Sequence, residues 1–337
     1  MTFPAEAQIA QAVSILRAGG LVAFPTETVY GLGADAANPD AVKRIFEAKG
    51  RPATHPLIVH LGGAGELDRW ARDIPPTARA LAERFWPGPL TLVLKRAGGV
   101  LDAVTGGQDT IGLRVPAHPI AQALLQAFGG GIAAPSANRF GRVSATTAQH
   151  VREELGDRVD LILDGGACEV GIESTILDLS TGAAVLLRPG RIGTEELAAV
   201  LHAPVTRAGA GSPRAPGSLA AHYAPQLPLR LVSGPVLDVS VREEAARGPV
   251  AVLARHPRPT SSPAAVWMNA PLDAVSYAHH LYAALRQLDR SSCLAILVEA
   301  PPETAEWAAV RDRLTRAALG SGAGERGATS AEASDGT

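Results

Sequence analysis

The chain has little of several features that mark common classes of protein. Its 337 residues include only two cysteines, Cys168 and Cys293, with no CxxC spacing, which argues against a disulfide scaffold and a zinc site. Aromatic residues make up only 4%. No apolar run approaches the roughly 18 residues that a membrane helix needs, and the first residues lack the pattern of a signal peptide. We therefore expect a cytoplasmic protein with reduced thiols and no membrane partner.

Positive charge is not in surplus either. Lys and Arg number 31 against 33 Asp and Glu, which gives a formal net charge of −2. An extended nucleic-acid surface needs clustered cations to neutralise phosphates, so we expect no stable direct binding of nucleic acid. A small anion pocket is compatible with this charge.

Several catalytic motifs are also missing. The sequence contains no GxxxxGK[ST], HExxH or GxSxG pattern. Gly31-x-Gly33 follows a predicted strand, but the next predicted strand carries His60 near its end, where a dinucleotide site would have an acidic residue. We therefore interpret Gly31 and Gly33 as turn glycines.

What the chain does have is a globular composition rich in residues that shape the backbone. Hydrophobic residues make up 46% and charged residues 19%, which is typical of a folded protein. There are 35 glycines and 26 prolines, together well above the usual share of about 12%. A chain of this length usually forms two domains.

The hydrophobic pattern predicts interleaved strands and helices in the first part of the chain. Asn38, Pro39 and Gly50 mark the start and stop of one of these helices. The irregular alternation favours an α/β domain with a twisted mixed sheet, followed by a smaller Rossmann-like α/β domain. The predicted boundaries are a catalytic domain at 1–202, a Pro- and Gly-rich linker or lid at 203–228, a C-terminal domain at 229–319 and an unstructured tail at 320–337.

Small polar and basic residues recur where predicted strands of the first domain end. Thr26 and Glu27 follow one strand, and Ser136 follows another. Arg114 stands in an otherwise apolar strand and needs an anionic partner. Ligands of α/β sheets bind at strand ends, so these residues predict a cavity for a polyanion such as a nucleoside triphosphate.

Lys49-Gly50-Arg51 places two cations across a helix stop. Compensation of the helix dipole explains one of them. A phosphate clamp explains both, because lysine supplies a point charge and arginine a bidentate fork. The pattern alone leaves both interpretations open.

Taken together, these segments resemble the threonylcarbamoyl-AMP synthases, in the long form that has a YrdC-like catalytic domain and a C-terminal domain. The resemblance spreads over most of residues 20–195. It is most specific in the KxR…SxN signature, here Lys49-Gly50-Arg51 and Ser136-Ala137-Asn138, and it extends more loosely to HYAP at 222–225. The other matching stretches are LVAFPTETVYGLGADA, PLIVHL, WPGPLTLVL, IGLRVP, GIESTILDL and LLRPGRI, together with the longer segments IFEAKGRP and APSANRFGRVSATTAQHV around the signature.

The resemblance implies a reaction in which L-threonine, bicarbonate and ATP give threonylcarbamoyl-AMP and pyrophosphate. The product would pass to proteins that modify adenosine in tRNA. Mg²⁺ would bind through the phosphates, with no protein ligand. The implied ATP-binding residues are Lys49, Arg51, Thr110, Ser136, Asn138, Ser144 and Arg188, with Tyr223 as part of a lid. The implied threonine-binding residues are Thr26, His60, Arg114 and Ser174, with Arg114 facing the carboxylate.

No residue stands out as a general base for this chemistry. Carbamates and mixed anhydrides hydrolyse readily, so the site must exclude water and act through positioning and charge neutralisation. His60 could serve as a base, although a histidine that orients the substrate is the favoured interpretation. Two alternatives stay open: an RNA-binding module, and a related protein that uses carbamoyl phosphate.

Overall fold

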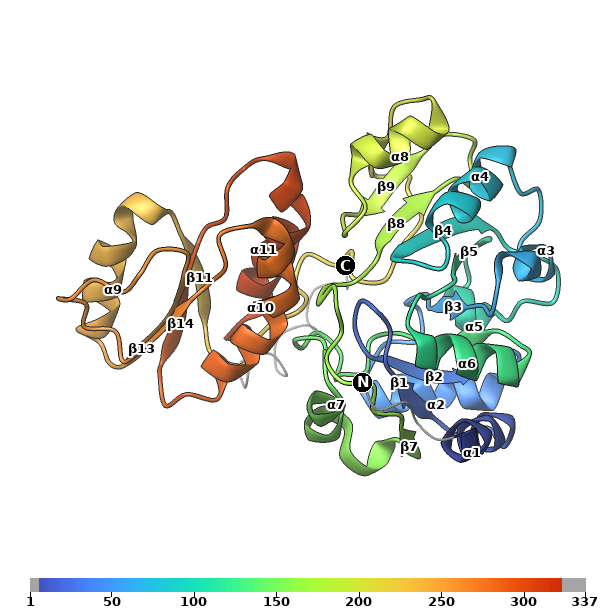
Figure 1. Cartoon of the computed structure of the whole chain (residues 1–337), viewed down its shortest axis with the longest axis horizontal. Helices are drawn as coiled ribbons and strands as arrows, with labels where there is room; N and C mark the ends of the chain where they lie inside the picture. The colour runs from blue at the N-terminus through green and yellow to red at the C-terminus, as the bar shows by residue number, and fades with distance from the viewer. Residues whose placement is uncertain (1–5, 323–337) are drawn as a thin grey trace, which may run out of the picture. The chain divides into compact units, whose positions relative to one another are not determined.

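The computed structural model describes residues 6–322 and divides the chain into two units (Figure 1). The first unit comprises the chain up to Phe140 and Ser144–Ser218. The second comprises Gly141–Val143 and the chain from Leu219 onward. Most of the predicted unstructured tail, from residue 323, lies outside the described residues. No helix between residues 6 and 322 combines the length and apolarity needed to cross a bilayer.

The first unit is built on a mixed ten-stranded sheet with the order β10-β9-β8-β4-β5-β3-β6-β2-β1-β7. Parallel and antiparallel pairs alternate irregularly across it, as the predicted fold class requires. The strands are β1 (Val22–Phe24), β2 (Gly31–Asp35), β3 (Ile58–His60), β4 (Leu90–Lys95), β5 (Thr110–Arg114), β6 (Ile132–Ala133), β7 (Leu161–Ile162), β8 (Thr175–Asp178), β9 (Val185–Arg188) and β10 (Thr206–Arg207).

Helices cover both faces of this sheet because its strands alternate apolar side chains between two clusters. On β1, Val22 and Phe24 pack against α1 and α6, whereas Ala23 belongs to the cluster that contains α2. The helices of the first unit are α1 (Glu6–Arg17), α2 (Pro39–Lys49), α3 (Leu67–Trp70), α4 (Pro76–Phe85), α5 (Asp102–Thr105), α6 (Pro119–Phe128), α7 (Ala148–Leu155) and α8 (Thr194–Leu201).

Helix α2 begins and ends where the sequence predicts. The Asn38 side chain accepts hydrogen bonds from the backbone N–H groups of Asp40 and Ala41. Gly50 adopts the left-handed conformation, with φ of 61°, and closes the last turn. This stop fixes the direction in which the chain continues into Arg51.

The interpretation of Gly31 and Gly33 as turn glycines is wrong, because both lie in strand β2. A Cβ atom on Gly33 would come within 2.7 Å of Phe24 Cε1 and 2.8 Å of Ile132 Cγ2. These glycines therefore allow the neighbouring strands β1 and β6 to pack closely across the sheet.

The second unit contains a four-stranded parallel sheet with the order β11-β14-β12-β13. Helix α9 lies on one side of this sheet, and α10 and α11 lie on the other (Figure 1), as in a Rossmann-like arrangement. The elements are β11 (Leu229–Val232), α9 (Leu237–Ala245), β12 (Val250–Ala254), β13 (Val266–Asn269), α10 (Ala274–Asp289), β14 (Ala295–Glu299) and α11 (Ala308–Gly320).

The segment predicted as a linker, 203–228, is divided between the two units. Thr206 and Arg207 form β10, which pairs in parallel with β9 of the first unit. The division falls between Ser218 and Leu219. Only the later part of the segment, including the HYAP sequence, therefore belongs to the second unit.

Candidate functional site

Several predicted ligand residues project from one face of the first sheet. Val59 on β3 and Ile111 and Leu113 on β5 point into the main core of the first unit. Because side chains alternate along a strand, their neighbours on β3 and β5 project from the other face of the sheet. His60 and Arg114 are register partners on the parallel strands β3 and β5. The predicted residues on or beside this face are His60, Thr110, Arg114, Ser174 and Arg188.

Arg114 has its anionic partner within the protein. Its Nη2 lies 2.7 Å from Glu27 Oε1, and both side chains are buried. Its Nη1 donates to Thr28 Oγ1 at 2.9 Å, and its Nε donates to the carbonyl of Gly88 at 3.2 Å. A guanidinium has five N–H donors, so these contacts leave capacity for a further acceptor such as a substrate carboxylate.

Thr26 continues this hydrogen-bond chain. Its hydroxyl donates to the Val29 carbonyl at 2.6 Å and lies 2.8 Å from the Thr28 hydroxyl. The backbone N–H groups of Thr28 and Val29 both point to Thr26 Oγ1, at 3.2 Å. Thr26 therefore shapes the turn that presents Thr28 and Glu27 to Arg114.

His60 is held in its neutral form. Burial, together with the nearby Arg114 guanidinium, lowers the pKa of His60 to about 3. Its ring meets Phe24 edge to face at 6.0 Å. Its Nδ1 is buried and has no hydrogen-bond partner among the described residues. A neutral imidazole of such low basicity is suited to orienting a polar group rather than to removing a proton at neutral pH.

Arg188 and Ser174 form a second buried cluster beside this face. Arg188 donates through Nε and Nη2 to the Ser174 carbonyl, at 3.0 and 2.9 Å, and through Nη2 to the Ser174 hydroxyl at 3.0 Å. The same hydroxyl lies 2.8 Å from Thr91 Oγ1 on β4. The positive charge of Arg188 therefore lies beside Ser174, just before β8.

The two halves of the KxR…SxN signature are in direct contact. The ammonium group of Lys49 donates to the backbone carbonyls of Ser136 and Asn138. Burial, together with the charge of Arg51, lowers the pKa of Lys49 well below its ordinary value. Arg51 donates to the Pro56 carbonyl at 2.8 Å and lies over the ring of Phe140. Two cations held this close together favour binding of an anion.

Ser144 donates to a carboxylate that the sequence interpretation overlooked. Its hydroxyl lies 2.6 Å from Glu173 Oε1, and both residues are buried. Glu173 and Glu27 each stand beside a predicted ligand, in the sequences IES and TET. Their position next to a predicted ligand is the one sign in the sequence that these two glutamates belong to the site, because the residues that they contact lie far away in the sequence.

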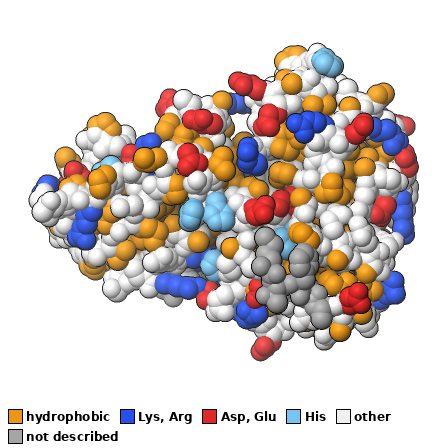
Figure 2. All heavy atoms as spheres, in the orientation of Figure 1, with side chains coloured by type: hydrophobic (Ala, Val, Ile, Leu, Met, Phe, Trp, Pro, Cys, Tyr) orange, Lys and Arg blue, Asp and Glu red, His pale blue; other side chains and the backbone are white. Residues whose placement is uncertain are grey.

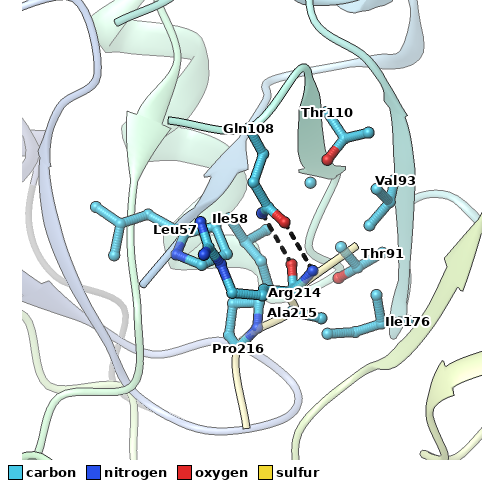
Figure 3. Close-up of a pocket in the computed structure, with 12 residues that line it drawn as sticks. Leu57, Ile58, Thr91, Val93, Gln108, Thr110, Ile176, Arg214, Ala215 and Pro216 are labelled. Carbon is cyan, nitrogen blue, oxygen red and sulfur yellow. Dashed lines mark hydrogen bonds between the residues drawn. The ribbon is translucent and has the colours of Figure 1, made fainter. Parts of the chain in front are cut away.

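A pocket lies over the same face of the sheet, and residues of β3, β4, β5 and β8 line it together with the segment 214–216 (Figure 3). Gln108 binds the backbone of Arg214 at both ends of its amide, with Arg214 N donating at 2.7 Å and Gln108 Nε2 donating to the carbonyl at 3.1 Å. Ala215 packs against Ile58, Val93 and Ile176. The segment 214–216 therefore lies as a strap across the face that carries Thr110.

Tyr223 belongs to the second unit and is 1% exposed. Its ring stacks on Tyr282 with centroids 5.8 Å apart, and the Arg313 guanidinium lies 5.2 Å from its centroid. Its φ of 61° is unusual for a residue with a side chain. The other predicted ligands fall in the first unit. Most of them lie in three groups: the Lys49 group (Lys49, Arg51, Ser136 and Asn138), the Arg114 group (Arg114, Thr26 and His60), and Ser174 with Arg188. Their roles, and the role of Tyr223 as a lid, stay predictions.

Charge on the surface is mixed. The face shown in Figure 2 carries Lys and Arg side chains interspersed with Asp and Glu, in keeping with a net charge of −2. Lys49, Arg51, Arg114 and Arg188 are 3–8% exposed, so the predicted site of the first unit holds four buried cations.

Comparison with known proteins assigns both parts of the chain. Residues 14–190 match the Sua5–YciO–YrdC family model, whose description is "Telomere recombination". Residues 192–319 match the model described as "Threonylcarbamoyl-AMP synthase, C-terminal domain".

Relatives of nearly full length are found among both archaea and bacteria. A threonylcarbamoyl-AMP synthase of Pyrococcus abyssi is 41% identical over 93% of this chain and 94% of its own length. One of Bacillus subtilis is 41% identical over 94% of both chains. The crystal structure of P. abyssi Sua5 complexed with L-threonine is 39% identical, covers 95% of this chain and 96% of its own, and has a TM-score of 0.88.

Proposed function

The chain belongs to the Sua5–YciO–YrdC family of threonylcarbamoyl-AMP synthases, and we propose that it acts as a nucleotidyltransferase. L-Threonine, bicarbonate and ATP are converted to threonylcarbamoyl-AMP and pyrophosphate. The product carries the threonylcarbamoyl group to proteins that modify adenosine in tRNA.

The reaction forms one nitrogen–carbon bond and exchanges one phosphorus–oxygen bond for another. Bicarbonate and a proton give carbon dioxide and water, and the amine of threonine then adds to the carbon of carbon dioxide and loses a proton, which gives a carbamate. A carbamate oxygen then attacks the α-phosphorus of ATP in line, and the bond to the β-phosphate oxygen breaks to release pyrophosphate. ATP enters as its magnesium complex, in which the metal reduces the negative charge of the phosphates.

The Arg114 group supplies the threonine end of the site. Arg114 offers a buried positive charge to the substrate carboxylate, and the Thr28–Thr26 hydrogen-bond chain fixes its orientation. Neutral His60 provides a hydrogen-bonding nitrogen on the same face. With Ser174, these residues orient the amine toward the carbon that it attacks.

The Lys49 group supplies the phosphate end. Burial and the charge of Arg51 lower the pKa of Lys49, and a phosphate bound nearby would raise it again because a negative charge stabilises the ammonium form. Arg51 adds a second cation, while Ser136, Asn138, Thr110 and Arg188 offer hydrogen-bond donors. Ser144, whose hydroxyl donates to Glu173, completes the set of residues at this end. In this arrangement the protein works chiefly through positioning and electrostatic stabilisation.

Exclusion of water is the third requirement, because both the carbamate and the mixed anhydride hydrolyse. The strap 214–216 covers the face that carries Thr110, so a nucleotide that reaches Thr110 must meet this segment. We propose that the strap acts as a lid over this face, and the role of Tyr223 as a lid residue stays a prediction.

The observation that carries this proposal is the clustering of His60, Arg114 and the buried Glu27 on one face of the first sheet. The test is pyrophosphate release from ATP, with threonine and bicarbonate omitted in turn. Release that depends on both substrates is expected. Release that depends on neither would refute the proposed reaction.

A further inference from the structure

Three residues of the loop between Asn138 and Ser144 pack as part of the second unit. Gly141, Arg142 and Val143 belong to it, although the chain on either side belongs to the first unit. The Ala224 N–H donates to the Gly141 carbonyl at 2.8 Å, and Arg142 forms a parallel β-bridge with Ala224. The second unit is therefore completed by a piece of the catalytic chain.

Helix α10 holds the last residue of this piece. Arg286, which is 8% exposed, donates through Nη2 to the carbonyl of Val143, which is 3% exposed. Asp289, one turn further along α10, lies 4.0 Å from Arg142 and accepts a hydrogen bond from the Leu227 N–H at 2.8 Å. Both the loop piece and the chain that follows HYAP are thus tied to the same end of α10.

Holding the Val143 carbonyl also restricts the position of Ser144. A peptide unit is planar and rigid, so the Val143 carbonyl and the Ser144 N–H move together. Ser144 in turn donates to the buried Glu173 at 2.6 Å. On the other side of the piece, Phe140 N–H donates to the Lys49 carbonyl at 2.8 Å. The loop is therefore fastened at Lys49, at α10 and at Glu173, with predicted nucleotide ligands at each end.

The loop contains one residue at which no side chain restricts the backbone. Gly141 has a φ of 76°, in the region that favours glycine, and a Cβ atom there would meet nothing within 4 Å. Backbone rotation at Gly141 is thus less restricted than at its neighbours. The hydrogen bond from Arg286 limits this freedom at the end that leads into Ser144.

We propose that Arg286 is a positioning residue for ATP: by holding the Val143 carbonyl, α10 of the second unit sets the loop that presents Asn138 and Ser144. This inference rests on the proposed function. It gives the second unit a task in catalysis, which is to fix the nucleotide-binding loop of the first unit through the covalent chain.

The test uses the full-length chain with Arg286→Met, which keeps the apolar stem and removes every donor. We expect the KM and the Kd for ATP to rise about tenfold, while the KM for threonine changes less than twofold. Arg286→Lys keeps a charged donor and should recover part of the ATP affinity. Arg247→Met, which removes an exposed cation of the second unit paired with Glu244, is the matched control and should leave both constants unchanged.

A purely structural role for Arg286 predicts a different result. It would lower the unfolding temperature and the amount of active enzyme, so kcat would fall while both KM values and the ATP Kd stayed unchanged. That outcome would overturn the proposal. If Arg286→Met does not fold, Arg286→Lys alone decides: a raised ATP KM with an unchanged threonine KM supports the proposal, and unchanged values for both refute it.

Hydrogen exchange separates this inference from the proposed function. Amides of the peptide that spans residues 139–147 should exchange faster in Arg286→Met than in Arg247→Met, without any ligand present. Faster exchange in Arg286→Met, found together with a wild-type chain that releases no pyrophosphate, would refute the proposed function and support the control of the loop by Arg286. Unchanged exchange would refute the control of the loop by Arg286.

Discussion

Arg114 and Glu27 form a buried ion pair, with Nη2 and Oε1 2.7 Å apart and side chains 5% and 7% exposed. The second carboxylate oxygen of Glu27 accepts a hydrogen bond from the Ala117 N–H at 3.0 Å. The pair therefore joins the turn after β1 to the chain that leaves β5. It also holds the Arg114 guanidinium in the place where a substrate carboxylate is proposed to bind.

Removing one member of this ion pair should lower the free energy of unfolding more than removing both members. Glu27→Gln leaves the Arg114 charge buried without its counter-ion, and we expect a loss of about 3–5 kcal/mol in the free energy of unfolding. Glu27→Gln combined with Arg114→Met should recover part of this loss. Urea unfolding of the single and double variants measures the coupling, and strictly additive effects would show that the two charges do not interact.

His60 should make stability depend on pH in the acidic range. Its pKa is about 3 in the folded protein and about 6.5 in the unfolded chain, so between these values the unfolded chain binds the additional proton. The stabilisation is complete above the unfolded pKa and is lost as the pH falls, with a limiting slope of about 1.4 kcal/mol per pH unit.

The comparison that isolates this effect is His60→Gln against wild type, with His280→Gln on the exposed part of α10 as the control. Between pH 7.5 and 5.5, the unfolding free energy of wild type should fall by about 1.4 kcal/mol more than that of His60→Gln. Equal falls in the two proteins would show that His60 is protonated as readily when folded.

The substitution Arg51→Ala should weaken the binding of ATP. Loss of charged hydrogen bonds to phosphate costs about 1.5–3 kcal/mol, so the KM for ATP should rise by roughly 10- to 100-fold. Lys43→Ala removes a cation of α2, the helix that ends just before Arg51; its side chain is 74% exposed, and the substitution should leave the KM unchanged. ATP affinity and turnover that stay at the wild-type level in Arg51→Ala would remove Arg51 from the site.

Gln108→Ala should release the strap 214–216. The substitution removes both hydrogen bonds to the Arg214 backbone, each worth about 1 kcal/mol. Trypsin cleavage after Arg214 should therefore accelerate by about tenfold. Gln122→Ala, which removes a hydrogen bond to the Pro116 carbonyl, is the control, and identical cleavage rates in the two variants would mean that Gln108 does not hold the strap.

Much of the fold could be predicted because its signals are local. Asn38, Pro39 and Gly50 fix the bounds of α2 by capping alone, and the apolar runs predict most of the strands. Strand β2 was missed because its glycines serve contacts with Phe24 and Ile132, which lie on neighbouring strands. A pattern of glycines does not distinguish a turn from a close approach between strands.

The family, and the types of side chain in the site, could be read from short segments of the chain. The KxR…SxN signature and the polar residues at strand ends carry that information. Which charges are paired was established by the folded structure. It assigned Glu27 to Arg114 and Glu173 to Ser144, and it placed residues 141–143 with the second unit. Each of these depends on where distant parts of the chain meet, and the physical reason is that pairing in a buried site is set by distance and desolvation, which follow from packing rather than from sequence spacing.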